Sequence, residues 1–141
     1  MNVLIDTNVI VDVLLRREPL FEDSELVLLA SDYNYINGYV SASAITDIFY
    51  VISKFFGDKS KARDLIKNSL IGTISIATVD SDTITEALDA SWDDFEDCVQ
   101  YVTGERISAD YIVTRNTKDF TRGTIKAITP KELLNIIAVD R

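Results

Sequence analysis

Polar side chains that could bind a metal ion or a phosphate group follow two short apolar runs of the chain. Asp6 comes directly after one run, and Thr114, Arg115 and Asn116 come directly after the other. In an open α/β sheet, ligands bind beyond the carboxyl ends of the strands, near a switch in strand order. If both runs are strands, these residues form a candidate site, although a helix-capping role alone would also explain Asp6.

Further acidic residues lie at the starts of predicted helices. Asp47 falls in the first turns of one helix, where the helix dipole alone is enough to explain an aspartate. Asp94 and Asp97 are three residues apart, so on a helix they share a face and repel each other unless a cation lies beside them. A solvated acidic helix start is the alternative explanation for this pair.

The composition restricts the available chemistry to carboxylates. The chain of 141 residues contains no histidine, which excludes Ser-His-Asp and Cys-His catalysis and His-ligated zinc. The single cysteine, Cys98, excludes an internal disulfide framework and a Cys-rich zinc site, and it indicates a reducing, cytoplasmic compartment. Clustered carboxylates favour a hard cation such as Mg²⁺ or Mn²⁺.

The charge balance argues against a protein that binds nucleic acid over its whole surface. The formal net charge is −9, from 14 basic and 23 acidic residues, whereas such proteins are normally basic. Local positive charge does follow the second apolar run, and we expect Arg115, Lys118 and Arg122 to guide the phosphates of a ligand there. A second basic group, for which ordinary solvated side chains are as good an explanation, consists of Lys54, Lys59, Lys61, Arg63 and Lys67.

Apolar runs and helical periodicity alternate along the chain and predict an α/β fold. Strands are expected at residues 3–5, 38–40, 74–79, 111–113 and 125–128. Helices are expected at residues 9–14, 25–30 with Pro19 at the opening, 43–57 with Ser43 as the cap, 60–70, 81–91, 94–103 with Gly104 as the stop, and 130–137. Such alternation predicts a central parallel sheet between two layers of helices, an α/β/α sandwich.

The chain shows no linker, repeat or low-complexity segment, so we expect a single domain over residues 1–141. Its apolar runs, such as residues 26–30, are far too short to span a membrane. The start of the chain also lacks the basic segment that precedes a secretory signal.

Taken together, the order and spacing of these motifs resemble the PIN-domain family, in particular the small VapC-like ribonucleases. The resemblance covers essentially the whole chain. The matching segments are DTNV at 6–9, DFED at 94–97, ADYIVTRN at 109–116, KDF at 118–120 and ITP at 128–130.

The resemblance implies a metal-dependent ribonuclease site built from three or four acidic residues. Asp6 matches the first acidic position of the family and Asp97 the third. Asp47 falls where most members carry glutamate, and Asn116 falls where many members carry a fourth aspartate. The shorter Asp47 and the uncharged Asn116 are therefore departures from the family pattern.

Other residues near these positions are given supporting roles by the same resemblance. Asp94 and Asp119 are further candidate ligands for Mg²⁺ or Mn²⁺, and Asp119 could compensate for the missing charge at position 116. Asn8 and Thr114 are expected to support the site by their contacts.

The resemblance also implies a reaction and partners. A bound cation would lower the pKa of a water and stabilise charge on the phosphate, and the products would carry a 5′-phosphate and a 3′-hydroxyl. The expected role is the toxin of a toxin–antitoxin pair, acting on RNA, covered by an antitoxin protein and forming a homodimer.

Two other hypotheses compete with this one. The first is a catalytically degenerate PIN-fold binding module, in which Asp47 and Asn116 record the loss of activity. The second is a phosphoryl-transfer enzyme or receiver domain. A haloacid-dehalogenase-like enzyme would need an aspartate two positions after Asp6, where this chain has Asn8.

Overall fold

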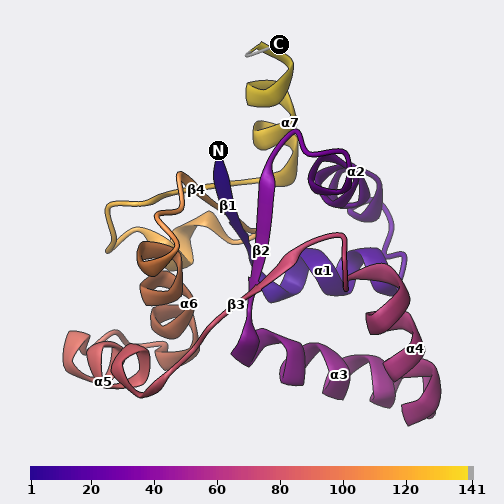
Figure 1. Ribbon diagram of the computed structural model, residues 1–141, viewed down its shortest axis with the longest axis horizontal. Coiled ribbons are helices and arrows are strands. Elements are labelled where there is room, and N and C mark those ends of the chain that lie inside the picture. Colours follow the sequence, from indigo (N-terminus) through magenta and orange to yellow (C-terminus); the bar gives the residue numbers. More distant parts are fainter. Residues whose placement is uncertain (140–141) are drawn as a thin grey trace.

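Within residues 1–139, which the computed structural model describes, five parallel strands form one sheet. Their order across the sheet is β3-β2-β1-β4-β5, so the first strand of the chain lies in the middle (Figure 1). The strands are β1 (Asn2–Ile5), β2 (Asn37–Ser41), β3 (Ser75–Ala77), β4 (Tyr111–Val113) and β5 (Lys126–Ile128).

Helices cover both faces of this sheet and complete three layers (Figure 1). On one face lie α1 (Thr7–Leu14), α2 (Phe21–Asp32), α3 (Ala42–Phe56), α4 (Lys59–Ser69) and α7 (Pro130–Val139). On the other lie α5 (Ser81–Ala90), α6 (Phe95–Arg106) and the short 3₁₀ helix η1 (Thr117–Phe120). The predicted α/β/α sandwich with a central parallel sheet is confirmed.

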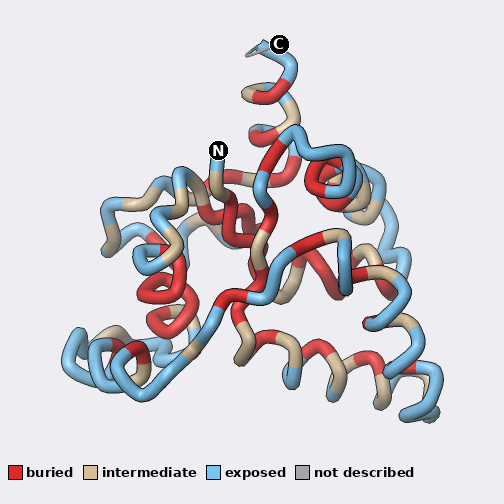
Figure 2. Tube along the Cα trace, in the orientation of Figure 1, coloured by how far each residue is buried: buried red, intermediate tan, exposed pale blue. Residues whose placement is uncertain are grey.

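The position of β1 in the middle of the sheet explains why its sequence is continuously apolar. Successive side chains of a strand point to opposite faces, so Val3 and Ile5 pack into the core on the α1 side while Leu4 packs into the core on the α6 side. All three side chains are fully buried (Figure 2). A strand covered on both faces needs apolar residues at every position.

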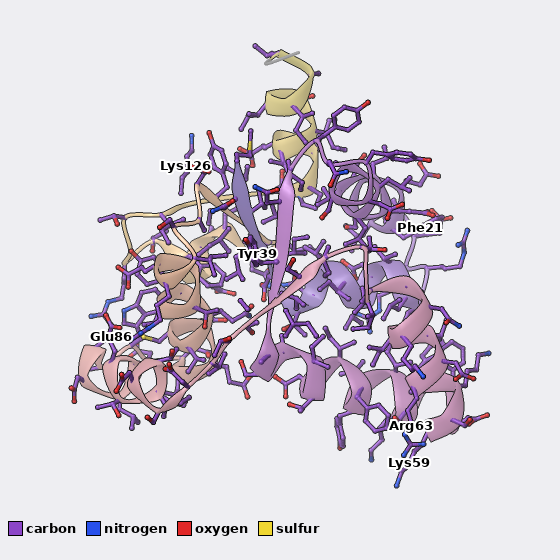
Figure 3. The ribbon with its side chains drawn as sticks, viewed as in Figure 1. Phe21, Tyr39, Lys59, Arg63, Glu86 and Lys126 are labelled. Atoms are coloured by element: carbon purple, nitrogen blue, oxygen red, sulfur yellow. The ribbon has the colours of Figure 1, made fainter. Side chains whose placement is uncertain are left out.

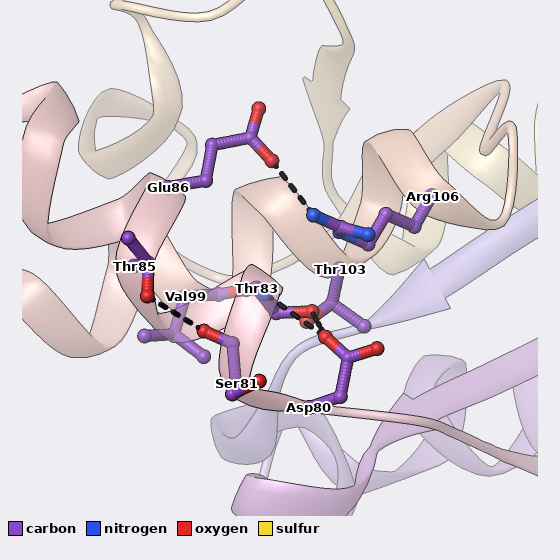
Figure 4. Close-up of polar contacts among 8 residues, drawn as sticks. All are labelled: Asp80, Ser81, Thr83, Thr85, Glu86, Val99, Thr103 and Arg106. Atoms are coloured by element: carbon purple, nitrogen blue, oxygen red, sulfur yellow. Dashed lines mark hydrogen bonds and ion pairs between the residues drawn. The ribbon is translucent and has the colours of Figure 1, made fainter.

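Helices α5 and α6 pack against each other. The carboxylate of Asp80 caps α5 by accepting from the Thr83 backbone N–H at 2.9 Å, and this bond lowers the pKa of Asp80. Farther along, the Arg106 guanidinium pairs with Glu86 at 3.2 Å (Figure 4). The Glu86–Arg106 pair therefore joins the two helices, whereas the Asp80 bond stabilises the start of α5.

Some helix boundaries differ from those expected from the sequence. Helix α6 does not stop at Gly104 but continues to Arg106, because Gly104 lies against Leu4 and Ile125 where the helix meets the sheet. The cap of α3 is Ser41 rather than Ser43, since the Ser41 backbone is extended and its hydroxyl accepts from the Ala44 N–H at 3.2 Å.

Helix α2 begins at Phe21, two residues after Pro19, so the expected opening by this proline is also wrong. None of the helices within residues 1–139 combines the length and the apolar character that crossing a membrane requires.

Candidate active site

A cleft of about 570 Å³ opens beyond the carboxyl ends of the strands. It lies where the strand order reverses, because the chain adds β2 and β3 on one side of β1 and then β4 and β5 on the other. Acidic side chains from α1, α3, α6 and η1 line it, namely Asp6, Asp47, Asp94, Glu96, Asp97 and Asp119. The acidic residues expected from the sequence therefore share one cleft.

Asp6 is the most firmly held of these carboxylates. It caps α1 and is only 5% exposed. One oxygen, Oδ1, accepts from the Thr7 backbone N–H at 2.8 Å and from the Gln100 side-chain amide, and Oδ2 accepts from the Thr114 hydroxyl at 2.7 Å. The capping explanation is thus correct, but it is incomplete, because two of the donors come from β4 and α6.

Thr114 links Asp6 to the loop that follows β4. Its buried hydroxyl donates to Asp6 and accepts from the Asn116 backbone N–H at 3.1 Å. The Asn8 side chain accepts from the Arg115 N–H at 3.4 Å, so the loop is held from two directions. Thr114 and Asn8 occupy the positions expected of supporting residues, and Asn116 lines the cleft.

Asp97, in the first turn of α6, has the most perturbed carboxyl group of the cleft. Burial is the largest cause of its raised pKa, and the neighbouring charges of Asp94, Asp119, Asp6 and Glu96 add to it, bringing the pKa to about 7. A carboxyl group with such a pKa marks a place where negative charge is crowded and not neutralised.

Asp94 stands before α6 rather than on it. Its carboxylate caps the helix by accepting from the Asp97 N–H at 2.9 Å. The expected shared helical face is therefore wrong, although Asp94 still raises the pKa of Asp97 by its charge. Asp47 lines the cleft from the α3 side and is exposed, and it is absent from the charges that act on Asp97.

Gln100 was not expected in the site, yet its side chain reaches the centre of it. The residue is 7% exposed and donates its amide N–H to Asp6. This bond directs the other end, Oε1, away from Asp6, and Oε1 is buried without a hydrogen-bond partner among residues 1–139. Its spacing of three from Asp97 on one helix was a signal in the sequence that could have identified it.

The predicted RNA-contacting residues are distributed unevenly. Arg115 lines the cleft, whereas Lys118 and Arg122 do not. Arg122 instead donates to the Ser91 carbonyl oxygen at 3.2 Å and lies over the Trp92 ring. The middle basic group lies on α3 and α4, and Figure 3 shows Lys59 and Arg63 at the outer end of this helical hairpin.

The donor chemistry of the cleft fits a hard cation. Its donors are carboxylate and amide oxygens, which Mg²⁺ and Mn²⁺ prefer. The unpartnered Oε1 of Gln100 and the crowded charge around Asp97 are features that a cation, with its bound waters, would satisfy. No three acidic or cysteine side chains in the described part of the chain are grouped closely enough to bind one ion together. Mg²⁺ usually keeps several waters and binds through one or two carboxylates, so this spacing is compatible with it.

Comparison with known proteins shows the family to which this chain belongs. The model of the PIN domain matches residues 2–118. Ribonuclease VapC1 of Aquifex aeolicus (strain VF5) is 30% identical over 137 residues, which cover 92% of this chain and 91% of the relative.

Solved structures share the fold at lower identity. FitAcB from Neisseria gonorrhoeae superposes with a TM-score of 0.68 at 17% identity, over 92% of this chain and 98% of that one. A toxin-antitoxin complex from Klebsiella pneumoniae superposes with a TM-score of 0.66 at 20% identity, over 91% of this chain and 97% of that one. The match to the domain model over most of the chain, together with the 30% identical relative, shows that this chain belongs to the PIN-domain family.

Proposed function

We propose that this chain is an endoribonuclease that hydrolyses RNA phosphodiesters with Mg²⁺ or Mn²⁺ in the acidic cleft. The observation that carries the proposal is the convergence of Asp6, Asp94, Asp97 and Asp119 on one cleft, where burial and the neighbouring negative charges together raise the pKa of Asp97 to about 7. The 30% identical relative named as a ribonuclease supports the same chemistry. The absence of histidine leaves carboxylates to carry it.

The residues of the cleft have distinct proposed roles. Asp6 and Asp97 would bind the cation directly. Asp94, Asp119, Asp47 and the Asn116 side-chain oxygen, which line the same cleft, would bind it through its waters. When bound, the ion activates a water for attack on phosphorus and stabilises the charge that develops on the phosphate.

Other residues of the cleft keep the Asp6 carboxylate in place. Thr114 and Gln100 each donate one hydrogen bond to Asp6, so its carboxylate is held in one orientation at the edge of the cleft. Asn8 holds the Arg115 backbone, which steadies the loop carrying Asn116. A carboxylate oriented in advance binds a cation without first losing rotamer freedom.

We also propose that the chain is the toxin of a toxin–antitoxin pair, with an antitoxin protein as its partner and a second copy of itself in a homodimer. The solved structure from Klebsiella pneumoniae, with the same fold, is a toxin-antitoxin complex. Light scattering over a range of protein concentrations tests the homodimer.

A second function, a binding module without catalysis, is favoured by two observations. No metal-binding group of three acidic or cysteine side chains exists within residues 1–139, and Asn116 contributes no charge. Such a module would keep the fold and a protein partner but would bind Mn²⁺ weakly and cut no RNA.

The test is cleavage of a mixed-sequence RNA by purified protein with Mg²⁺, with Mn²⁺ and with EDTA. Asp6→Asn and Asp97→Asn are compared with Asp89→Asn, which removes an exposed carboxylate on α5 outside the cleft. Cleavage that needs the metal and is lost only in the first two variants supports the nuclease.

Two other outcomes contradict the nuclease. Folded wild-type protein that neither cuts RNA nor binds Mn²⁺ identifies the binding module. Cleavage that survives both cleft substitutions belongs to a contaminant or to another site. Circular dichroism of each variant confirms that the fold is retained.

A further inference from the structure

A carboxylate that the proposed reaction does not use is buried beneath the cleft. Asp12 lies on α1, and its side chain is fully buried. Burial raises the pKa of Asp12, and the nearby Arg115 and Arg17 guanidinium groups work in the opposite direction. Within residues 1–139 neither carboxylate oxygen accepts a hydrogen bond of good geometry, so the ion pairs are what hold this charge.

Asp12 pairs with two arginines from distant parts of the chain. The Arg115 Nε lies 3.0 Å from one oxygen, and the Arg17 Nη1 lies 3.6 Å from the other. Arg17 follows the end of α1, and Arg115 follows β4. The buried anion therefore fixes two guanidinium groups beside each other.

Both arginines also face the cleft. They line it together with the acidic residues, and their side chains remain 44% and 34% exposed for Arg17 and Arg115 respectively. A guanidinium carries five N–H donors, and the contact with Asp12 uses one nitrogen of each. Among residues 1–139 the other donors pair with no further carboxylate, so they can bind an anion.

We infer that Arg17 and Arg115 form a subsite for a backbone phosphate of RNA next to the one that is cut, with Asp12 as their positioning residue. Two fixed guanidinium groups match the planar, multidentate hydrogen bonding that phosphate oxygens accept. They place positive charge on one wall of a cleft whose other walls are acidic, so an acidic protein can hold RNA there. The inference rests on the proposed function.

The cost of burying Asp12 agrees with a positioning role. A carboxylate removed from water is expensive, and an apolar residue in its place is often neutral or stabilising. Asp12 cannot touch a ligand itself, because its side chain is fully buried. What it does is hold two cationic side chains against an otherwise acidic cleft.

The experiment measures binding of a fluorescent, mixed-sequence single-stranded RNA by anisotropy in metal-free buffer at several salt concentrations. Arg17→Gln and Arg115→Gln should each weaken binding about tenfold, as the loss of a charge-assisted hydrogen bond predicts. Each should reduce the slope of log affinity against log salt by about 0.7. The control Lys126→Gln removes an exposed cation at the amino end of the sheet (Figure 3) and should change neither value.

Asp12→Asn separates positioning from simple charge. Removing a negative charge near the cleft would strengthen RNA binding if only net charge mattered, whereas release of the two arginines weakens it. Weaker RNA binding by a variant whose near-ultraviolet circular dichroism spectrum is intact supports the positioning role of Asp12. Tighter or unchanged RNA binding overturns it.

If Asp12→Asn does not fold, Arg17→Lys and Arg115→Lys decide, since each keeps the charge but loses the planar fork. Wild-type RNA affinity in both lysine variants would overturn the proposed phosphate subsite. Weaker RNA binding with an unchanged salt slope would support it.

Cleavage assays distinguish failure of this inference from failure of the proposed function. If wild-type protein binds RNA through the two arginines but does not cut it, the phosphate subsite is supported and the proposed nuclease activity is contradicted. If wild-type protein cuts RNA and the Arg17→Gln and Arg115→Gln variants match it in KM and in RNA binding, the nuclease activity is supported and the phosphate subsite is contradicted.

Discussion

At the scale of single residues, the cleft contrasts one carboxylate that is fully hydrogen bonded with one that is crowded by charge. Asp6 accepts bonds from Thr7, Thr114 and Gln100, whereas Asp97 is surrounded by other acidic groups. The Asp6 side chain is therefore held in place before a ligand binds. Asp97 is the residue whose protonation changes when a ligand binds.

The raised pKa of Asp97 predicts a stability that depends on pH. Between the ordinary value of 3.8 and about 7, the folded protein keeps this carboxyl group protonated while the unfolded chain ionises it. The folded state thus binds more protons in this range, and its stability falls as the pH rises through it. We expect the melting temperature of metal-free protein to decrease over this range relative to Asp97→Asn. Melting temperatures that change with pH in the same way for the two proteins would contradict the raised pKa of Asp97.

Thr114→Val tests the hydrogen-bond chain that holds Asp6. Valine keeps the shape of the buried threonine but leaves Asp6 Oδ2 and the Asn116 N–H without their partner. We expect a loss of about 1–3 kcal/mol in the free energy of unfolding and a decrease in cleavage rate larger than the increase in KM. Chemical denaturation and single-turnover cleavage measure the two effects. Thr85→Val, at an exposed threonine on α5, is the matched control.

Sequence reasoning identified the residues whose role depends on their own position and missed those whose role depends on distant partners. Asp6, Asp97 and Thr114 stand at the ends of recognisable elements, so parallel-sheet geometry was enough to bring them together. Gln100 and Asp12 lie within helices, and their partners are far along the chain, as Gln100 and Asp6 show with a separation of 94 residues. The sequence pattern does not show which distant residue a helical side chain contacts, although the spacing of three from Asp97 does place Gln100 on the same face of α6.

At the scale of elements, helix α6 connects the site to the sheet. Its first turn carries Asp97, its middle carries Gln100, and its last turn packs Gly104 against β1. A glycine near the end of an apolar pattern is typical of a helix stop, but here Gly104 lies within the last turns of the helix. The strands were found from their continuous apolar runs because both faces of the sheet are covered.

Two glycines near α6 should respond in opposite ways to replacement by alanine. At Gly104 a methyl group would meet Ile125 at 3.4 Å and Leu4 at 3.6 Å, which are ordinary contacts. Alanine also favours the helix, so Gly104→Ala should stabilise the protein by about 0.5–1 kcal/mol.

At Gly123 a methyl group would stand 2.1 Å from the Tyr101 ring. That ring stacks on Trp92 and its hydroxyl accepts from the Thr124 N–H at 2.7 Å, so it cannot easily retreat. Gly123→Ala should therefore destabilise the protein by about 1–3 kcal/mol. Urea denaturation of both alanine variants checks the signs, and equal shifts would contradict the packing described around α6.

At the scale of the whole molecule, an acidic chain with a net charge of −9 folds around a cleft that concentrates part of that charge. A cation bound there should stabilise the entire fold, since it binds the folded state and not the unfolded one. The mutual repulsion of the carboxylates in the cleft is the energy that the cation relieves.

Mg²⁺ at about 100 times its dissociation constant should stabilise the protein by about 2.7 kcal/mol. The melting temperature should then rise by about 10 °C for a chain of this size. EDTA should reverse the rise, and the shift should be much smaller in Asp6→Asn and Asp97→Asn at equal ionic strength. An equal rise in the variants would place the ion outside the cleft.

The strand order also determines when the site comes into existence during protein synthesis. β1 leaves the ribosome first, yet it occupies the centre of the sheet and cannot be covered on its far side until β4 follows. The Thr114 hydroxyl that fixes Asp6 is made 108 residues after it. Contacts between such distant residues form late, because the intervening chain must first be closed into a loop. A nascent chain therefore carries Asp6 past ribosomal RNA with no working cleft around it, and the site is assembled only after Thr114 has been made.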